Sequence, residues 1–514
     1  MHRDNLGLDA VDSRFLQTCD LPQDDSYKKP FVLVIFGGTG DLSKRKLLPM
    51  LYHLEQEERL SHHSKIVGLG RGDITDKQYR SFVLDALKTF AIESFDQDRA
   101  KTFCTRIGYL AADARSDAGY QKLCRRIRDL TAGDAADSLV YYLAVPPDLI
   151  RPTIEGLFKY NLCGGRLTPK IVIEKPFGRD KKTAANLNHF ILEHFNEQQV
   201  YRIDHYLGKE TVQNILFFRF ANSILEPLWN RRYIDHIQIT VAEDIGVEGR
   251  AAFYEQAGVV RDIVQNHMMQ LLALVTMEPP VGFAPDLVRD EKVKVFRALR
   301  PVGDEHITTF MVRGQYAPAG SVPGYRSEEQ VPPDSNTPTF FAGKFFIDNW
   351  RWAGVPFYLR TGKRLAARAT QIIVQFKQPP LRLLGRTCDI IEPNLLVLGI
   401  QPKEQISLRL NVKHPGPGNR PHAINLDFDY SRNFGLKKHS AYERLLLDCL
   451  RGDLTLFARA DEVEAMWEIV DPIIAQWDSI PPDDFPNYPA GTWGPNDAHS
   501  LLAHDGRAWI EPEH

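Results

Sequence analysis

The fold of the N-terminal part of this chain is decided by the stretch Phe31-Val-Leu-Val-Ile-Phe-Gly-Gly-Thr-Gly-Asp-Leu-Ser43. Its first six residues are all apolar, which is typical of a strand buried on both faces of a parallel sheet. Glycines end the strand, and a helical pattern begins at Asp41. Pro49 lies inside that pattern and is expected to kink or restart the helix. The stretch therefore predicts a strand, a glycine turn and a helix.

The glycine turn also predicts a dinucleotide-binding site. A helix entered from a strand through glycines exposes backbone N–H groups on which a pyrophosphate can rest. Gly37 allows the tight turn, Gly40 allows close approach of the backbone, and Ser43 fills the third small position. A purely structural glycine turn would have the same Gly-x-x-Gly-x-x-Ser pattern. We favour cofactor binding because a strand and a helix flank the turn.

The end of the next predicted strand indicates which cofactor is bound. An NAD-preferring site usually has an acidic residue there, which binds the ribose 2′-hydroxyl. This chain has Arg71 instead, and a fixed cation favours the 2′-phosphate of NADP. Asp73, two residues later, leaves the use of NAD open. The alternative interpretation is that Arg71 is an ordinary surface charge.

Sequence periodicity divides the chain into two parts. Apolar runs alternate with amphipathic stretches up to about residue 203, as in βαβ units on a parallel sheet. Beyond it, period-two alternation at 237–241, 406–412 and 424–430 is typical of antiparallel strands with one wet face, and helical patterns return at 258–277 and 440–476. We predict an α/β plus α+β protein with a polar leader (1–28), a Rossmann-like dinucleotide-binding domain (29–203) and an α+β domain with a large, mainly antiparallel sheet (204–514).

The bulk composition argues against several classes of protein. The formal charge is 63 − 66 = −3, which gives no reason to expect a nucleic-acid partner. No apolar run approaches the ~18 residues of a membrane span, and the N-terminus has no signal-peptide core, so no membrane partner is expected. The six cysteines are scattered without a Cys-x-x-Cys pair. Their spacing argues against a disulfide framework or a zinc cage and favours a reducing, cytoplasmic location.

Polar, chemically active side chains are densest in Arg-Ile-Asp-His-Tyr-Leu-Gly-Lys-Glu, residues 202–210. This run offers a carboxylate that can orient a neighbour, a cation for a phosphate and two further hydrogen-bond donors, although a solvated turn would be equally polar. Lys175 ends another predicted strand, at the sheet edge where such folds bind ligands, and Pro176 after it is a candidate cis proline. Asp262 and His267 are five residues apart on an amphipathic stretch, so they need not face each other.

Most single histidines on helices, and most charged residues such as Glu243, Lys363 and Arg368, are structural or exposed. Periodicity alone therefore does not show that these polar segments form one site. Five motifs in this order do so by resemblance: residues 37–46, Glu-Lys-Pro-Phe-Gly (174–178), residues 202–210, Arg-Asp-Ile-Val-Gln-Asn-His (261–267) and Arg-Thr-Gly-Lys (360–363). Over about residues 30 to 495, the chain resembles the glucose-6-phosphate dehydrogenase family.

The resemblance implies oxidation of C1 of glucose 6-phosphate to a lactone, the first step of the oxidative pentose phosphate pathway. NADP is the implied hydride acceptor, with NAD as a weaker alternative and no metal, in a homodimer or homotetramer. His267 corresponds to the general base and Asp204 to the carboxylate that orients it. The implied substrate contacts are Lys175, His205, Tyr206, Lys209, Glu243, Asp262, Lys363 and Arg368. The implied cofactor contacts are Gly37, Gly38, Thr39, Gly40, Asp41, Leu42, Ser43, Lys46, Arg71 and Lys175.

The chain departs from the family pattern in two ways. Animal members bind a second, structural NADP through arginines where this chain has Ile373 and Gly399, so we expect that site to be absent. Ser43 stands where many relatives have alanine, and the position stays small. Two alternatives to the implied activity are a dehydrogenase for another sugar or sugar phosphate and a non-catalytic sensor that binds NADP.

Overall fold

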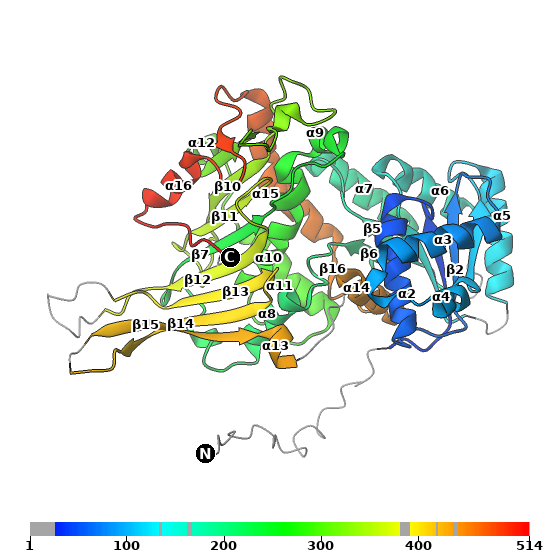
Figure 1. Ribbon diagram of the computed structural model, residues 1–514, viewed down its shortest axis with the longest axis horizontal. Coiled ribbons are helices and arrows are strands. Elements are labelled where there is room, and N and C mark those ends of the chain that lie inside the picture. The colour runs from blue at the N-terminus through cyan, green and yellow to red at the C-terminus, as the bar shows by residue number, and fades with distance from the viewer. Residues whose placement is uncertain are drawn as a thin grey trace, which may run out of the picture.

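The computed structural model describes residues 26–132, 136–161, 167–380, 391–417, 420–434 and 440–512, so most of the expected polar leader lies outside the described residues. Two β-sheets dominate it (Figure 1). The first has the order β16-β6-β5-β4-β1-β2-β3. Its strands are β1 (Phe31–Phe36), β2 (Lys65–Gly70), β3 (Ile107–Ala111), β4 (Ser138–Leu143), β5 (Lys170–Glu174), β6 (Val200–Ile203) and β16 (Phe457–Ala458).

All pairs in this sheet are parallel except the pair of β16 with β6. The strand order reverses between β1 and β4, which is where a doubly wound sheet binds its ligand. The predicted Rossmann-like fold is therefore confirmed. Its main helices are α2 (Leu48–Gln56), α3 (Asp76–Phe90), α4 (Gln97–Cys104), α5 (Asp117–Leu130), α6 (Ile150–Lys159) and α7 (Lys181–His194).

The helix after the glycine turn restarts at the predicted proline. It begins at Asp41, widens into a π-helical segment, η1 (Ser43–Leu47), and continues as α2 with Pro49 in its first turn. The N–H of Leu48 donates to the carbonyl of Ser43, five residues back. Proline lacks an N–H group and clashes with the preceding turn, so a wider turn accommodates it.

The second sheet has the order β15-β14-β13-β12-β7-β11-β10-β8 and is antiparallel except for the pair of β7 with β11. The predicted large, mainly antiparallel sheet is confirmed. Its strands are β7 (Ile234–Ala242), β8 (Met311–Gly314), β10 (Phe340–Phe345), β11 (Phe357–Gly362), β12 (Ala369–Phe376), β13 (Leu395–Gln401), β14 (Gln405–Lys413) and β15 (Pro421–Asp429). A small sheet pairs β9 (Tyr316–Ala317) with β17 (Tyr488–Pro489).

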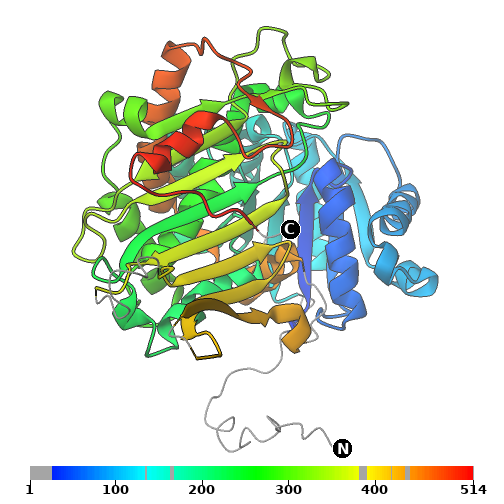
Figure 2. The same ribbon diagram turned by 60° about the vertical axis from the view of Figure 1, so that its left-hand side comes forward.

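The expected wet face is wrong for β7, because Gln238 and Thr240 are buried. The C-terminal segment crosses this face of the sheet (Figure 2), and the side-chain amide of Gln238 pairs with its backbone. Gln238 Nε2 donates to the carbonyl of Ala508 at 2.9 Å, and the N–H of Ile510 donates to Gln238 Oε1 at 2.9 Å. Alternation in a sequence shows which residues are polar, but it does not show whether water contacts them. Here another part of the chain supplies the hydrogen bonds that water would otherwise make.

Helices pack around the second sheet (Figure 1). They are α8 (Glu210–Phe220), α9 (Ala251–Val259), η7 (Val260–Met268), α10 (Met269–Thr276), α11 (Pro285–Ala298), α12 (Asp304–Phe310), α13 (Tyr430–Phe434), α15 (Ala460–Ser479) and α16 (Asn496–Ala503), whereas α14 (Ala441–Arg451) packs against the first domain. The helical pattern expected at 258–277 is confirmed as η7 and α10 after a kink at Gly258, whereas β16 interrupts the one expected at 440–476. None of the described helices is long and apolar enough to cross a membrane.

The chain returns to the first sheet near its C-terminal end. β16 pairs with β6, and α14 packs against the same domain (Figure 1). Lys170 Nζ donates to the carbonyls of Cys449 at 2.7 Å and Leu450 at 2.8 Å, which caps the end of α14. α15 then leads back to the helices of the second sheet. The boundary predicted at residue 203 stays a prediction, because later residues contribute to both sheets.

The cysteines differ in state. Cys104 and Cys449 are free and buried, and burial raises the pKa of the Cys104 thiol to about 11. Cys124 is disulfide-bonded. The cysteine-based argument for a reducing compartment therefore loses part of its support.

Candidate active site

The glycine turn packs tightly against the end of β2. The N–H groups of Gly37 and Gly38 both donate to the carbonyl of Leu69, at 2.9 and 3.0 Å. A Cβ on Gly38 would lie 2.6 Å from the Cα of Gly68, and Gly37 has a φ of +82°. The buried hydroxyl of Ser43 donates to the Gly37 carbonyl at 2.8 Å. The turn is thus fixed from both sides, with its third small residue acting as an internal brace.

The residues expected to contact the cofactor surround this turn. Thr39, Asp41 and Lys46 are exposed, and Leu42 is half-buried. Arg71 lies exposed just beyond β2, which pairs with β1, so its side chain starts next to the turn. The first N–H groups of the helix that begins at Asp41 have no intrahelical acceptor. This edge therefore combines free donors, a helix N-terminus and a nearby cation, which suit a phosphorylated dinucleotide.

The centre of the candidate site is a hydrogen bond between His267 and Asp204. His267 Nδ1 lies 2.5 Å from Asp204 Oδ1, and the side chains are 1% and 3% exposed. The N–H of Tyr206 also donates to Asp204 Oδ1, at 2.9 Å. Burial opposes ionisation of Asp204, but interaction with His267 outweighs it and holds the pKa of Asp204 well below its usual range. Burial lowers the pKa of His267, although Asp204 acts in the opposite direction.

This arrangement leaves a neutral imidazole with its free nitrogen directed at Lys175. Nδ1 carries the proton that Asp204 accepts, so Nε2 has the lone pair. Lys175 Nζ lies 3.1 Å from His267 Nε2, 2.7 Å from the carbonyl of Asp262 and 3.3 Å from Asp262 Oδ1. The bond from Lys175 to Pro176 is cis, as the sequence suggested.

The helix geometry explains why Asp262 and His267 both reach Lys175. An α-helix has 3.6 residues per turn, so residues five apart point in different directions. Here the segment is the π-helix η7, in which residue i bonds to residue i+5. The wider turn brings the two side chains to one spot. Burial opposes ionisation of Asp262, but Lys175 and Lys363 outweigh it and hold its pKa at about 2.

The edge of the second sheet supplies the next group of residues. β7 and β11 are parallel neighbours with Ala242 opposite Gly362, so the residues that follow them, Glu243 and Lys363, meet. Lys363 Nζ lies 2.7 Å from Glu243 Oε2 and 3.9 Å from Asp262 Oδ2. Arg368 precedes β12, whose first residue pairs with the end of β7, and it is exposed at the same edge. Three of the expected substrate contacts, Glu243, Asp262 and Lys363, are thus brought together, and Arg368 lies at the same edge of the sheet.

A second polar cluster surrounds Lys209. Its ammonium lies 4.0 Å from the centre of the Tyr206 ring and donates to the side-chain oxygen of Gln401. Gln401 Nε2 lies 3.5 Å from the Tyr206 hydroxyl, which is 3.3 Å from Thr370 Oγ1. Burial, followed by the charge of Arg368, lowers the pKa of Lys209 to about 8. A bound anion would relieve this crowding of positive charge.

His205 lies between the two clusters. Its ring is 4.6 Å from the His267 ring, edge to face, and stacks parallel to Tyr442 at 6.1 Å. Burial and the neighbouring His267 hold the pKa of His205 well below its ordinary value. The Tyr206 ring stacks on His267 at 4.3 Å. Every residue of the 202–210 motif that was singled out therefore touches the site.

Three residues of the site were missed from the sequence. Gln401 ends β13, Tyr442 comes from α14, and Glu174 ends β5. Glu174 accepts a hydrogen bond of 2.5 Å from the hydroxyl of Tyr142, and burial raises its pKa to about 7. Glu174 had a signal, since it precedes Lys175 in the quoted motif. Gln401 and Tyr442 had none, because only the folded chain brings them here.

Ile373 and Gly399, which stand where animal members of the family have the arginines that bind a second NADP, lie in the second sheet. Ile373 is 1% exposed within β12. A Cβ on Gly399, in β13, would lie 2.7 Å from the carbonyl of Lys403. Next to Ile373 on the same face, Gln371 donates to the carbonyl of Ile510 at 2.9 Å. The C-terminal segment thus occupies this part of the sheet, and Gly399 has no room for a side chain.

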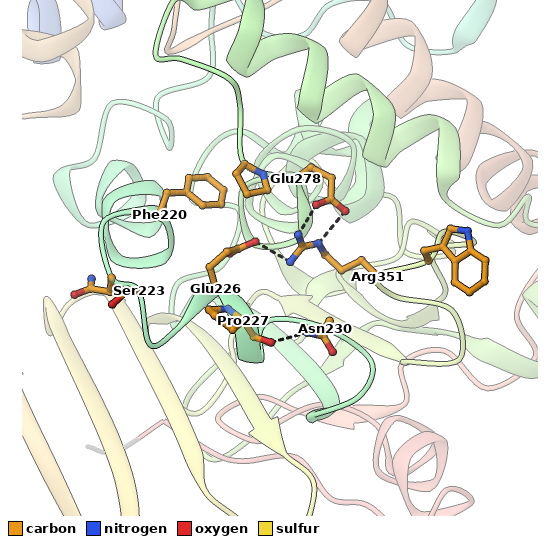
Figure 3. A pocket seen from close by; sticks show the side chains of 10 residues that line it. Phe220, Ser223, Glu226, Pro227, Asn230, Glu278 and Arg351 are labelled. Carbon is orange, nitrogen blue, oxygen red and sulfur yellow. Dashed lines mark hydrogen bonds and ion pairs between the residues drawn. The ribbon is translucent and has the colours of Figure 1, made fainter.

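A surface hollow of about 670 Å³ lies apart from these residues (Figure 3). Arg351 crosses it between two carboxylates, with Nη1 2.7 Å from Glu226 Oε1 and Nε 2.9 Å from Glu278 Oε1. The charge of Arg351 is thus paired with those of Glu226 and Glu278, and no histidine lines the hollow. It therefore offers no candidate base for a reaction.

Comparisons with known proteins agree with this geometry. The family model described as "Glucose-6-phosphate dehydrogenase, NAD binding domain" matches residues 34–214, and "Glucose-6-phosphate dehydrogenase, C-terminal domain" matches residues 216–510. The chain is 44% identical to a glucose-6-phosphate 1-dehydrogenase of Rhizobium meliloti (strain 1021), over 94% of this chain and 98% of that one. It is also 44% identical to that of Bacillus subtilis (strain 168), over 93% and 98%.

Two solved structures are similar over nearly their full length. One is described as "Glucose-6-phosphate dehydrogenase in complex with its substrate glucose-6-phosphate"; it has a TM-score of 0.86 and 35% identity, over 95% of this chain and 99% of that one. The other is a glucose-6-phosphate 1-dehydrogenase from Mycobacterium avium, with a TM-score of 0.80 and 37% identity, over 94% and 100%.

Proposed function

The chain belongs to the glucose-6-phosphate dehydrogenase family, and we propose that it oxidises C1 of D-glucose 6-phosphate to the lactone with His267 as the base. One observation carries the assignment of the base. His267 is buried, its Nδ1 is bonded to the Asp204 carboxylate, and its Nε2 faces the residues expected to bind the sugar. NADP supplies the hydride acceptor when bound.

The proton of the C1 hydroxyl leaves as the hydride departs, and a neutral imidazole accepts it best near neutral pH. Asp204 holds the tautomer in which Nε2 is free, and its charge stabilises the imidazolium that forms. General-base assistance of this kind contributes ~10²–10⁴-fold to the rate. Lys175 now donates to the lone pair of Nε2, so it has to release this nitrogen when the sugar hydroxyl binds.

The sugar phosphate belongs with Lys209, His205, Tyr206 and Arg368. The lowered pKa of Lys209 reflects burial beside Arg368, an arrangement that an anion stabilises. Gln401 adds a side-chain amide at this position. Because the phosphate is remote from C1, its binding energy serves to hold the sugar in a reactive pose. Glu243, Asp262 and Lys363 then meet the ring hydroxyls.

The cofactor belongs over the glycine turn, with its pyrophosphate against the first N–H groups of the helix that begins at Asp41. The N–H groups of Gly37, Gly38 and Gly40 already donate to carbonyls of the protein and fix the turn. Arg71 favours NADP over NAD, because its charge meets the 2′-phosphate that NAD lacks. Lys46 and Lys175 add positive charge along this edge. The lack of space at Gly399 and the C-terminal segment beside Ile373 support a chain without a second NADP. A cytoplasmic location and the absence of a metal remain part of the proposal.

Purified protein with glucose 6-phosphate and NADP is expected to produce the absorbance of reduced nicotinamide. His267→Asn is expected to lose about 10²-fold or more in kcat with little change in substrate affinity, because the base is lost and the anion contacts remain. The matched control is His189→Asn, on an exposed histidine of α7. Steady-state kinetics provide the measurement, and near-normal kcat in His267→Asn would exclude His267 as the base.

Lys209→Ala is expected to remove most of the preference for glucose 6-phosphate over glucose. A hydrogen bond to a charged group contributes about 1.5–3 kcal/mol, or ~10–100-fold in kcat/KM. Lys294→Ala, on an exposed lysine of α11, is the control for loss of a positive charge. The measurement is kcat/KM for both sugars. Equal activity of the unmodified protein on both would refute the phosphate assignment, and competition with galactose 6-phosphate tests the choice of sugar.

Arg71→Ala is expected to weaken NADP binding far more than NAD binding, because only NADP carries the 2′-phosphate. Asp73→Ala, two residues away, is the matched variant and is expected to leave NADP binding nearly unchanged. Fluorescence titration of each cofactor gives the dissociation constants directly. An equal loss for both cofactors in Arg71→Ala would move the phosphate contact to another residue.

A homodimer or homotetramer through the second sheet is expected. Its outer strands expose apolar side chains, among them Val412 at 40% and Leu426 at 53%. Leu426→Arg is expected to lower the oligomeric state because it places a charge in the contact. Light scattering after size exclusion measures the mass. A monomeric unmodified protein would overturn the proposal, as would a variant whose mass does not change.

A further inference from the structure

A group of charged side chains is buried where β6, α11 and α15 meet, next to the site but outside it. Figure 1 shows α15 between the two sheets. The side chains of Arg202, Arg289, Lys292 and Glu462 are at most 1% exposed. None of them is among the residues proposed to touch sugar or cofactor.

Glu197 links the first sheet to the helices of the second. Its Oε1 accepts from Arg202 Nη1 at 2.7 Å, from Arg289 Nη2 at 3.2 Å and from the N–H of Ala460 at 3.2 Å. Arg202 belongs to β6, Arg289 to α11, and Ala460 begins α15. One carboxylate oxygen therefore ties three elements together.

Gln270 lies at the other end of this network, where it contacts Glu462 and Lys292. Glu462 lies 2.8 Å from Lys292 Nζ, and Arg289 Nε is 3.9 Å from the other Glu462 oxygen. The amide of Gln270 spans this pair. Its Nε2 donates to Glu462 Oε2 at 3.2 Å, and its Oε1 accepts from Lys292 Nζ at 3.1 Å. Gln270 is 0% exposed, so water does not replace either bond.

The two ends of the network lie beside the two members of the proposed dyad. Arg202 is two residues before Asp204, and Gln270 is three residues after His267, one turn along the same helix. Asp204 and His267 come from different parts of the fold, so some contact has to fix their separation. The network runs from one to the other through Glu197, whose side chain is 21% exposed, and otherwise through groups that are at most 1% exposed.

Stability alone does not account for such a network. Taking charges out of water costs several kcal/mol per ion, and apolar replacements of buried ion pairs are often as stable or more so. What buried charges held by several hydrogen bonds supply is a defined geometry. Geometry matters here, because a misplacement of about 1 Å at a reacting group costs about 10²-fold in rate.

We propose that Gln270 is a positioning residue, which with Arg202, Glu197, Arg289, Lys292 and Glu462 holds His267 in register with Asp204. The proposal rests on the proposed function, which gives His267 and Asp204 their roles as base and orienting carboxylate. The hydrogen bond between His267 and Asp204 can also be followed by its proton resonance, which does not require turnover.

Gln270→Met tests the link. Methionine has a similar length but no amide, and the ion pair of Lys292 with Glu462 stays intact. We expect kcat to fall about 10²-fold while KM for both substrates stays close to that of the unmodified protein. We also expect the far-downfield proton resonance of the short His267–Asp204 hydrogen bond to weaken or move upfield. Asp290→Asn, on an exposed residue of α11 outside the network, is expected to change neither.

Thermal unfolding separates positioning from general destabilisation. If Gln270→Met does not fold, Glu462→Gln tests the same network, because a neutral amide accepts a weaker hydrogen bond from Gln270 and removes the charge opposite Lys292. A normal kcat and a normal downfield resonance in the variant that folds would overturn the proposal, as would a lower melting temperature with the resonance unchanged. Lack of turnover in the unmodified protein would instead refute the proposed function.

Discussion

The hydrogen bond between His267 and Asp204 is the interaction on which the arrangement of the molecule depends. Asp204 follows the last parallel strand of the first sheet, and His267 lies on a helix that packs against the second. The bond forms only when the first sheet and the helix on the second sheet are in place relative to each other. A local chemical requirement, a carboxylate on one imidazole nitrogen, thus constrains the whole fold.

Both sheets contribute to the site through the same geometric rule. Residues after parallel strands meet at one edge, which brings Lys175 and Asp204 together at the ends of β5 and β6. The second sheet is antiparallel except at β7 and β11, and Glu243 and Lys363 follow these two strands. The single parallel pair of an otherwise antiparallel sheet therefore lies where two polar residues have to meet.

The sequence predicted what local rules determine. The glycine turn, the restart at Pro49 and the two kinds of sheet follow from neighbouring residues and were predicted. The pairing of Asp204 with His267 came from family resemblance, because no periodicity connects them. The wide turn of η7 comes from packing, and Gln401 and Tyr442 reach the site only through the topology. β16 has two residues, too few for a pattern.

The burial of polar residues explains both the main error and the main omission. Gln238 lies under the C-terminal segment and Gln270 lies between Lys292 and Glu462, so each amide has its partners inside the protein. From the sequence, the strand that contains Gln238 was expected to have a solvent-exposed face, and no pattern singled out Gln270. A buried amide with both ends bonded specifies one geometry, because any shift leaves a donor or acceptor unpaired at a cost of about 1–3 kcal/mol. Such residues fix the relative position of elements that apolar packing alone would allow to slide.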